Sequence, residues 1–261
     1  MGQSNGRTPV IWENLTWKEI GALAASGIDL ALLPVGATEQ HGPHLAVGMD
    51  TVCARRLAHA VSAETGVPVL PALPYGCSLG HSRRWPGTIA LQPQTLVETV
   101  VQIFEWMHAS NFRRLIMVNG HVGNFAPLRC ALEIIRSRFD DAMAAVKNVA
   151  EISARVRTEF FADAQDWHAN AAETSLMLAL EPQLTRPAEL SSSDDPDRTG
   201  ALIFSHPVNR TSINGVTGFP SRATAEQGER LFAWMVEDLA AQVRAAMTEE
   251  PPLPNSYFVP A

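Results

Sequence analysis

The sequence predicts an α/β fold built on a mostly parallel β-sheet that helices cover on both faces. Short apolar runs typical of buried strands alternate with longer helix-like segments along most of the chain. Strands that alternate with helices usually run parallel, because each helix carries the chain back across the sheet. The 261 residues are 46% hydrophobic and 18% charged, an ordinary globular composition. No internal repeat or clean boundary divides the sequence, which predicts one domain over residues 1–261.

The first predicted strand is the apolar run Ile28–Val35, which ends at Gly36. A helix is predicted over Thr51–Glu64. A second strand is predicted over Val67–Leu73, and its two prolines favour the sheet edge, because proline cannot donate a hydrogen bond to a neighbouring strand. A helix over Pro93–Ala109 follows, with proline in its first turn.

The second half of the chain continues the alternation. Arg114–Val118 is a third predicted strand and Phe125–Arg138 the helix after it. Ala144–Ile152 is a fourth predicted strand. Helices are then predicted over Ala171–Leu180 and over Ala223–Met247, the last with an apolar stripe along one side.

The segment Ser191–Arg222 breaks this pattern. It is rich in Asp, Ser, Pro and Gly and shows no clear periodicity. A stretch of this length without regular structure usually has a function or forms an interface. The sequence leaves open whether this segment forms a lid or subunit contacts.

Charge and cysteine content exclude several classes of protein. The net charge is −7 and no Lys/Arg-rich run stands out, which argues against a nucleic-acid or anionic-membrane partner. Cys53, Cys77 and Cys130 are scattered and form no C-x-x-C pair, so we expect no disulfides and a cytoplasmic location. The polar N-terminus lacks a signal-peptide pattern. No apolar run approaches the roughly 20 residues that span a bilayer.

Ligand-type side chains gather where the predicted strands end. In open parallel sheets, sites form beyond the carboxyl ends of the strands. Glu39 and His41 follow the first strand two residues apart and therefore point to one side of extended backbone. His121 follows the third strand between glycine-rich turns. Asp50 and Glu173 lie at the starts of predicted helices.

Each of these residues also has a purely structural explanation. Asp50 could cap its helix, Glu173 could favour the positive end of its own, and His121 or His168 could be an ordinary turn or surface histidine. Two histidines and three carboxylates near the ends of one sheet nevertheless suit Zn²⁺, Mn²⁺ or Fe²⁺, which accept nitrogen and oxygen ligands. The lack of thiolates argues against a purely structural zinc site.

Four segments resemble the signature blocks of the creatininase (creatinine amidohydrolase) family. They are PVGATEQHGPH, WPGTIAL, RRLIMVNGHVGN and AETSLMLAL. The similarity extends from ENLTWKEI to GVTGFPSRATAEQGE and so covers nearly the whole chain. The resemblance implies a three-layer α/β/α sandwich, two divalent metal ions per chain (Zn, Mn or Fe) and a homo-oligomer, often a hexamer.

The resemblance also implies roles for individual residues. It assigns Glu39 and His121 to one metal, His41 and Glu173 to the other, and Asp50 to both. His168 corresponds to the family's acid/base histidine. The implied reaction is cleavage of a C–N amide bond by a hydroxide that bridges the two metals, with His168 passing a proton to the leaving nitrogen. Three carboxylates and one hydroxide would balance the four positive charges of the ions.

The sequence departs from the creatinine-hydrolysing members near the substrate. They carry a glutamate two residues after the NGH histidine and a tryptophan four residues before the acid/base histidine, where this chain has Gly123 and Ala164. Trp167 stands where creatininase has a glutamate. We therefore expect a cyclic amide, a formamide or a similar small amide as substrate, cleaved at a bond other than a peptide bond. Creatinine itself, or a peptide bond, is the alternative.

Further residues are candidates for contact with the substrate. His44, Trp85, Phe125 and Trp167 are the predicted substrate-binding residues, with four others considered for the same pocket: His81, Arg83, Arg84 and His206. An arginine facing the cleft would suit an anionic substrate group.

Two other readings remain open. Gly76–Gly80 fits the G-x-S-x-G pattern of a serine nucleophile elbow, with Ser78 as nucleophile and His168 or His206 as its partner. That pattern requires a strand before it and a helix after it, and Pro86-Gly87 makes a poor helix. The other reading is a metal-stabilised subunit that binds a ligand or partner without catalysis.

Overall fold

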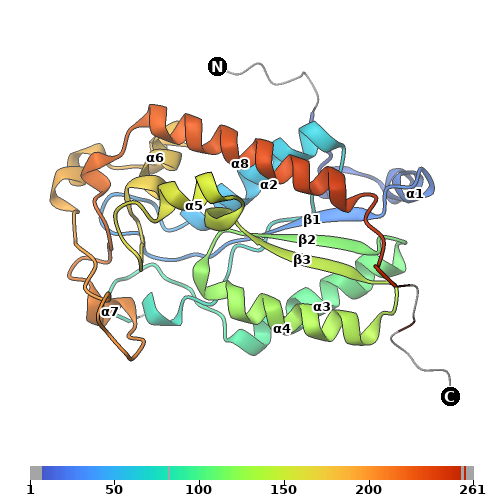
Figure 1. The fold of residues 1–261 in the computed structure, drawn as a ribbon, viewed down its shortest axis with the longest axis horizontal. Helices are drawn as coiled ribbons and strands as arrows, with labels where there is room; N and C mark the ends of the chain where they lie inside the picture. The colour runs from blue at the N-terminus through green and yellow to red at the C-terminus, as the bar shows by residue number, and fades with distance from the viewer. Residues whose placement is uncertain (1–7, 82, 254–255, 257–261) are drawn as a thin grey trace.

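A computed structural model describes residues 8–81, 83–253 and 256. A central sheet lies between two layers of helices (Figure 1). One layer holds α2 (Met49–Thr65), α5 (Ala154–Phe160), α6 (Ala171–Leu180) and α8 (Ala225–Ala246). The opposite layer holds α3 (Pro93–Ala109) and α4 (Phe125–Arg138), while α1 (Trp17–Ala25) lies near one end of the sheet. The α/β fold with helices on both faces of a parallel sheet is thus confirmed.

The sheet has the order β1-β2-β3 and all of its pairs are parallel. Its strands are β1 (Leu30–Val35), β2 (Arg114–Asn119) and β3 (Met143–Asn148). The segment expected as a second strand, Val67–Leu73, instead pairs with β1 only through isolated bridges at Val69 and Leu73. Its prolines carry no N–H, which interrupts the ladder.

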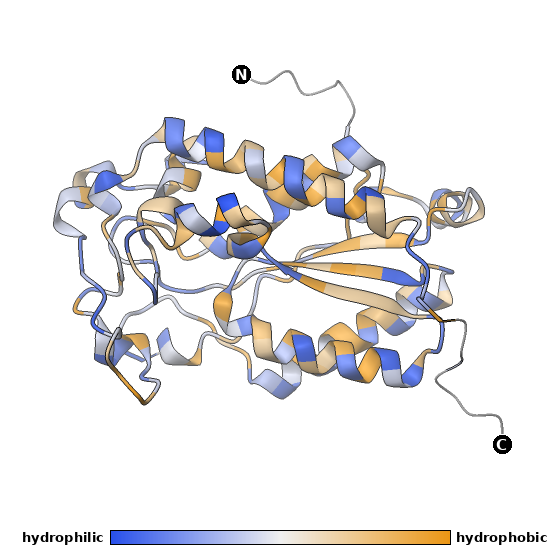
Figure 2. Ribbon diagram, in the orientation of Figure 1, coloured by the Kyte–Doolittle hydropathy of each residue, from blue (hydrophilic) through white to orange (hydrophobic). Residues whose placement is uncertain are grey.

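The side chains of β1 contribute to two hydrophobic cores, one with each layer of helices. All six are buried, and Leu30 and Leu32 join the cluster formed with α2, α6 and α8. Ala31, Leu33 and Val35 join the cluster formed with α3 and α4. This division follows from the alternation of side chains along a strand. Figure 2 shows mostly apolar strands between helices that carry both apolar and polar residues.

Two predicted boundaries differ from the structure near the site. Helix α2 begins at Met49 and not at Thr51, so Asp50 lies inside the first turn, and Gly48 precedes the helix without a side-chain cap. The expected strand Ala144–Ile152 ends at Asn148 and continues as the 3-10 helix Val149–Glu151. The apolar residues after Asn148 are buried without being extended, so their hydrophobicity indicated burial and not a strand.

The segment Ser191–Arg222 contains the short helix α7 (Val208–Thr211) and 3-10 turns at its ends. Asp195 holds it together, because its carboxylate accepts hydrogen bonds from Ser212 Oγ and Ile213 N at 2.8 and 2.7 Å. Asp195 and Gly218 also exchange backbone hydrogen bonds. The segment therefore has a defined path despite its lack of sequence periodicity.

Helices α6 and α8 pack closely through a glycine, and we expect this contact to resist substitution. A Cβ on Gly228 would lie 1.8 Å from the backbone oxygen of Ser175. Gly228→Ala should therefore lower the free energy of unfolding by about 1–3 kcal/mol through overpacking. Urea denaturation would measure the loss. Gly21→Ala in α1 is the control, since its Cβ would meet nothing within 4 Å and should raise stability by about 0.5–1 kcal/mol.

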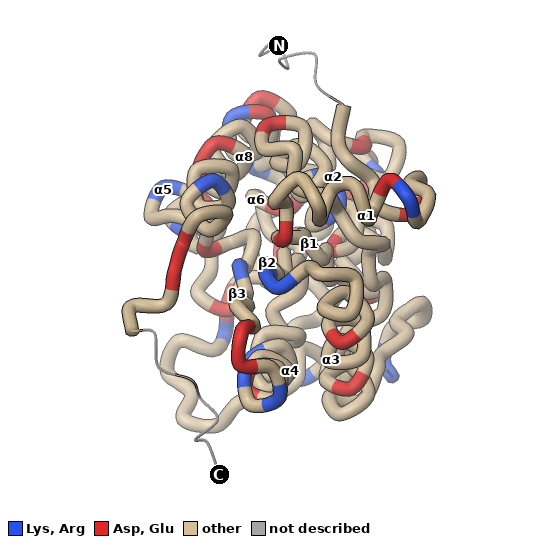
Figure 3. Tube along the Cα trace, turned by 90° about the vertical axis from the view of Figure 1, so that its right-hand side faces the viewer, with Lys and Arg blue, Asp and Glu red and all other residues tan. Residues whose placement is uncertain are grey.

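Acidic and basic residues are mixed over the outer helices in the end-on view (Figure 3). Within the described part of the chain, no helix combines the length and the apolarity needed to cross a membrane.

Candidate metal centre

Five predicted ligands converge beyond the carboxyl ends of β1 and β2. Glu39 and His41 follow β1, His121 follows β2, and the first turns of α2 and α6 supply Asp50 and Glu173. All five are buried. The ligand atoms of three overlapping groups lie within 4.8 Å of one another, namely Glu39/Asp50/His121, His41/Asp50/Glu173 and Glu39/His41/His168.

Asp50 lies between the first two groups. Its Oδ2 is 3.4 Å from His121 Nδ1, and its Oδ1 is 3.2 Å from His41 Nε2. Glu39 Oε2 lies 3.2 Å from His121 Nε2 on one side, and Glu173 Oε1 lies 3.9 Å from His41 Nε2 on the other. The two oxygens of Asp50 therefore face one histidine of each group.

The burial of these carboxylates is not matched by hydrogen-bond donors. Both oxygens of Glu39, which is 0% exposed, and Oδ2 of Asp50 have no hydrogen-bond partner. A buried polar oxygen left without a partner costs free energy, and such atoms are rare in native proteins. Divalent cations would satisfy them, and the donor set of carboxylate oxygens and imidazole nitrogens suits Zn²⁺, Mn²⁺ or Fe²⁺. The residues therefore fit divalent metal ions.

Burial shifts the pKa values of the two glutamates upward. It raises the pKa of Glu39, with an added contribution from the charge of Asp50, and raises the pKa of Glu173 to about 7. Burial opposes the positive charge of His41, but Asp50 and the glutamates outweigh it and raise the pKa of His41 to about 10. Without a cation, the crowded carboxylates can be neutralised only by protons.

Several contacts orient the ligands. His41 Nδ1 lies 3.1 Å from the backbone oxygen of Glu39, which leaves Nε2 facing Asp50. Glu173 Oε2 accepts a hydrogen bond from Ala169 N at 2.6 Å, while its own N–H is capped by Asn170. Such hydrogen bonds commonly fix the direction of metal ligands.

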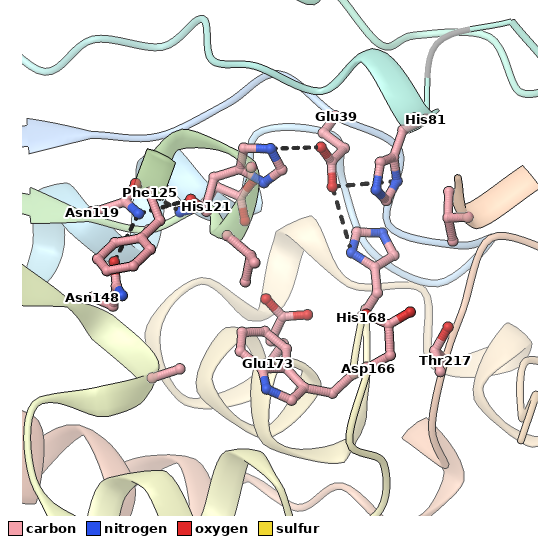
Figure 4. Close-up of a pocket in the computed structure, with 18 of the residues that line it drawn as sticks. Glu39, His81, Asn119, His121, Phe125, Asn148, Asp166, His168, Glu173 and Thr217 are labelled. Carbon is pink, nitrogen blue, oxygen red and sulfur yellow. Dashed lines mark hydrogen bonds and ion pairs between the residues drawn. The ribbon is translucent and has the colours of Figure 1, made fainter. Parts of the chain in front are cut away.

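The histidine assigned to proton transfer lies at the edge of the cluster. His168 Nδ1 is 3.4 Å from Glu39 Oε1 (Figure 4). Burial, and then the neighbouring His81 and His41, lower the pKa of His168 well below its ordinary value. His168 is therefore neutral at rest, as an acceptor of protons must be.

A cavity of about 620 Å³ opens onto this cluster. Phe125 and Trp167, both predicted to contact substrate, line it, as do His81 and His206. Trp167 also packs against Phe160 and Phe161 at centroid distances of 5.1 and 5.9 Å. The cavity therefore has an aromatic wall beside the histidines.

The structure places the other substrate-binding candidates outside the cavity lining. His44 is buried and its Nε2 lies 2.9 Å from Thr174 Oγ1, so the ring is turned into the core. Trp85 stacks under the guanidinium of Arg84 at 4.9 Å. Arg84 does not line the cavity. Its guanidinium donates hydrogen bonds to three carbonyl groups, those of Asn209, Ser212 and Ile213.

The cavity also contains residues that the sequence analysis did not select. Asn119 and Asn148 lie at the ends of β2 and β3, joined by a 3.0 Å hydrogen bond (Figure 4). The rule that located His121 at a strand end would also have located Asn148, but the predicted strand ran past it. Glu151 and Asp166 line the cavity as well, and no Lys or Arg does so within the described ranges.

The residue after Val122 distinguishes this site from the expected creatininase pattern. A Cβ on Gly123 would lie 2.4 Å from the backbone oxygen of Cys77 and 2.5 Å from His121 Nε2. A glutamate at this position would require the backbone or His121 to move. The side of the centre nearest His121 therefore depends on other residues for any further ligand.

Ser78 does not stand in a nucleophile elbow. It is followed by the 3-10 helix Leu79–His81 and not by an α-helix, and it is 1% exposed. Its Oγ does lie 3.3 Å from a histidine, but the partner is His121 and neither His168 nor His206. Because Ser78 is not part of the cavity lining, the serine-hydrolase reading lacks an accessible nucleophile.

Comparisons with known proteins show the family of the chain. A family model described as "Creatininase: Creatinine amidohydrolase" matches residues 13–243. The chain belongs to the creatininase family. It is a creatininase-family amidohydrolase, a hydrolase of C–N bonds, as the resemblance of its sequence blocks predicted.

The names of the similar creatininase-family proteins refer to different substrates. A creatinine amidohydrolase of Pseudomonas putida is 31% identical over 88% of this chain and 94% of its own. A mycofactocin precursor peptide peptidase of Mycolicibacterium smegmatis is 33% identical over 84% of this chain and 86% of its own. A solved mutant creatininase of Zn-Zn type superposes with a TM-score of 0.81 at 28% identity, covering 92% of this chain and 99% of its own.

Proposed function

We propose that this protein hydrolyses the C–N bond of a small amide at a centre of two divalent metal ions. The two ligand groups share Asp50, with Glu39 and His121 on one side and His41 and Glu173 on the other. The observation that carries the proposal is the set of buried carboxylate oxygens in these groups that have no hydrogen-bond partner. Substrate would enter through the cavity beside Phe125 and Trp167.

The side chains divide the chemistry between them. When bound, the ions would polarise the substrate carbonyl and lower the pKa of water from ~15.7 toward ~7. Glu39, Asp50 and Glu173 supply three negative charges that offset the charge of the ions. His168, whose Nδ1 faces the cluster, accepts the proton of the attacking water and passes it to the leaving nitrogen. The carbonyl carbon keeps the oxygen, and the nitrogen departs as a neutral amine.

Metal content gives a direct test. Protein purified without chelator, or reloaded with Zn²⁺, Mn²⁺ or Fe²⁺, should contain two transition ions per chain by elemental analysis. Chelation should abolish hydrolysis, and reloading should restore it. One ion or none after reloading would contradict the two-metal centre. Inhibition by a serine-directed phosphonate with indifference to chelators would instead support Ser78.

The charge of the cavity predicts which amides are accepted. Glu151 and Asp166 line it without a compensating Lys or Arg among the described residues. We therefore expect neutral or cationic amides to be cleaved at least about tenfold faster, by kcat/KM, than matched amides with an extra carboxylate, because about 1.4 kcal/mol of repulsion suffices. A screen of cyclic amides, formamides and short peptides with assays for released amine and carboxylate would test this. A preference for the anionic member of each pair would contradict it.

The same screen separates the alternatives for substrate. Creatinine is a small neutral compound, and a peptide would extend along the aromatic wall of Phe125 and Trp167. The lack of space for a side chain at Gly123 supports a non-creatinine substrate, since the creatinine-hydrolysing pattern places a glutamate there. If only peptides were cleaved, the result would support the alternative that the protein is a peptidase.

We also propose a single-domain, cytoplasmic homo-oligomer, with a hexamer as the expected form. Large apolar side chains support subunit contacts, since Trp17, Trp106 and Ile203 are 78%, 73% and 93% exposed. All three cysteines are free, as suits a reducing compartment. Light scattering coupled to gel filtration would give the subunit number.

A further inference from the structure

Gln40 lies between two predicted metal ligands and is only 4% exposed. Two backbone groups fix the orientation of its amide. Gly42 N donates to Oε1 at 3.0 Å, and Nε2 donates to Gly215 O at 3.0 Å. Glycine is required at position 215, where φ is +88° and a Cβ would lie 2.0 Å from Oε1. The amide nitrogen of Gln40 is therefore the end that faces the histidines.

The backbone of Gln40 determines which nitrogen of His168 carries the proton. His168 Nε2 lies 2.8 Å from Gln40 O, and a carbonyl oxygen can only accept. Nε2 must therefore be the protonated nitrogen in the neutral ring. The amide Nε2 of Gln40, 3.2 Å away, is also a donor and so does not hydrogen-bond to that N–H. Nδ1 of His168 then presents a lone pair toward Glu39 Oε1.

The side chain of Gln40 has the same effect on His81. One hydrogen of its Nε2 goes to Gly215 O, and the other faces His81 Nδ1 at 3.0 Å. His81 Nδ1 must therefore accept, although Glu39 Oε1 lies 3.4 Å away and would bind an N–H there. Both histidines thus turn unprotonated nitrogens toward one oxygen of Glu39.

We infer that Gln40 is a positioning residue that holds His81 and His168 as Nε2–H tautomers, through its side-chain amide and its backbone carbonyl respectively. This arrangement keeps Glu39 Oε1 free of hydrogen-bond donors and available to a cation. It also makes Nδ1 the nitrogen through which His168 accepts and releases protons. The last statement rests on the proposed function, whereas the tautomers do not.

Solid-state ¹⁵N NMR of zinc-loaded, histidine-labelled protein would test the inference. Protonated and unprotonated ring nitrogens give separate signals, and His81→Gln and His168→Gln would assign them by loss of a signal. We expect both histidines to be Nε2–H in the parent protein. In Gln40→Met and Gln40→Glu, His81 should switch to Nδ1–H, since it can then donate to Glu39 or to the new carboxylate. His168 should keep its tautomer, because the backbone carbonyl remains.

Function should change with the tautomer. Gln40→Met should weaken zinc binding or lower kcat by roughly 10–100-fold, the range for losing a residue that orients a metal ligand, with KM changed by less than about threefold. Gln242→Met is the matched control, because Gln242 donates to Ile152 O at 2.8 Å away from the cavity. It should leave both tautomers and kcat unchanged.

Two results would overturn the inference. One is an Nδ1–H signal for His81 or His168 in the parent protein, which needs no variant to fold. The other is an unchanged His81 in both Gln40 variants. A protein with the expected tautomers but no amide hydrolysis would contradict the proposed function alone.

Discussion

Asp50→Asn should remove at least one metal ion per chain and lower kcat/KM by roughly 10³-fold or more. Asp50 is the one carboxylate present in both ligand groups, with Oδ1 facing His41 and Oδ2 facing His121. An amide keeps the shape but supplies a neutral oxygen and an N–H that repels a cation. Losing several kcal/mol of charge stabilisation corresponds to this decrease in rate. Elemental analysis and steady-state kinetics on the same preparation would measure both effects.

Asp195→Asn is the control for losing a buried carboxylate. Asp195 is as buried as Asp50, but its oxygens bind Ser212, Ile213 and Arg198. Its substitution should affect the stability of the surrounding segment and leave two ions in place. If Asp50→Asn retained two ions and normal turnover, the shared-ligand arrangement would be wrong.

His168→Ala should keep both metal ions and lower kcat by about 10²–10⁴-fold, the usual contribution of a general acid or base. The amine is a poor leaving group until it is protonated, and His168 is a neutral histidine whose Nδ1 faces Glu39. Substrate binding through the cavity walls should survive, so KM should change little. Single-turnover kinetics with metal analysis would separate loss of chemistry from loss of metal.

His59→Gln provides the comparison, because His59 is a half-buried histidine of α2 that does not line the cavity. Its kcat should match the parent value. Turnover by His168→Ala at the parent rate would refute the proton-transfer role. Loss of metal in that variant would instead indicate that His168 is a ligand, as its group with Glu39 and His41 would allow.

Local sequence rules predicted the parts of this site that depend on strand ends. The apolar run of β1 indicated where the sheet would present Glu39 and His41, and β2 did the same for His121. Alternation along β1 also explains why neighbouring residues enter different cores. These features follow from short stretches of sequence, in which side-chain direction is set by backbone periodicity.

Features that depend on distant pairs could not be predicted in this way. Gln40 is oriented by Gly215, 175 residues later, and Arg84 is drawn to carbonyl groups more than 120 residues away. His44 was predicted to contact substrate, but its ring is oriented into the core by Thr174, which lies 130 residues later in the sequence. The predicted strand also ran past Asn148, where β3 ends, because an apolar run occurs both in strands and in buried turns.

The backbone of His168 is paired with Thr217 by two hydrogen bonds, of 3.0 and 2.7 Å. Thr217 also lines the cavity (Figure 4) and lies within the segment Ser191–Arg222, six residues after the end of α7. Insertions or replacements within residues 191–216 can therefore reshape the cavity wall beside His168 while leaving every predicted metal ligand in place. Such an arrangement gives evolution a way to diversify specificity within one hydrolytic scaffold.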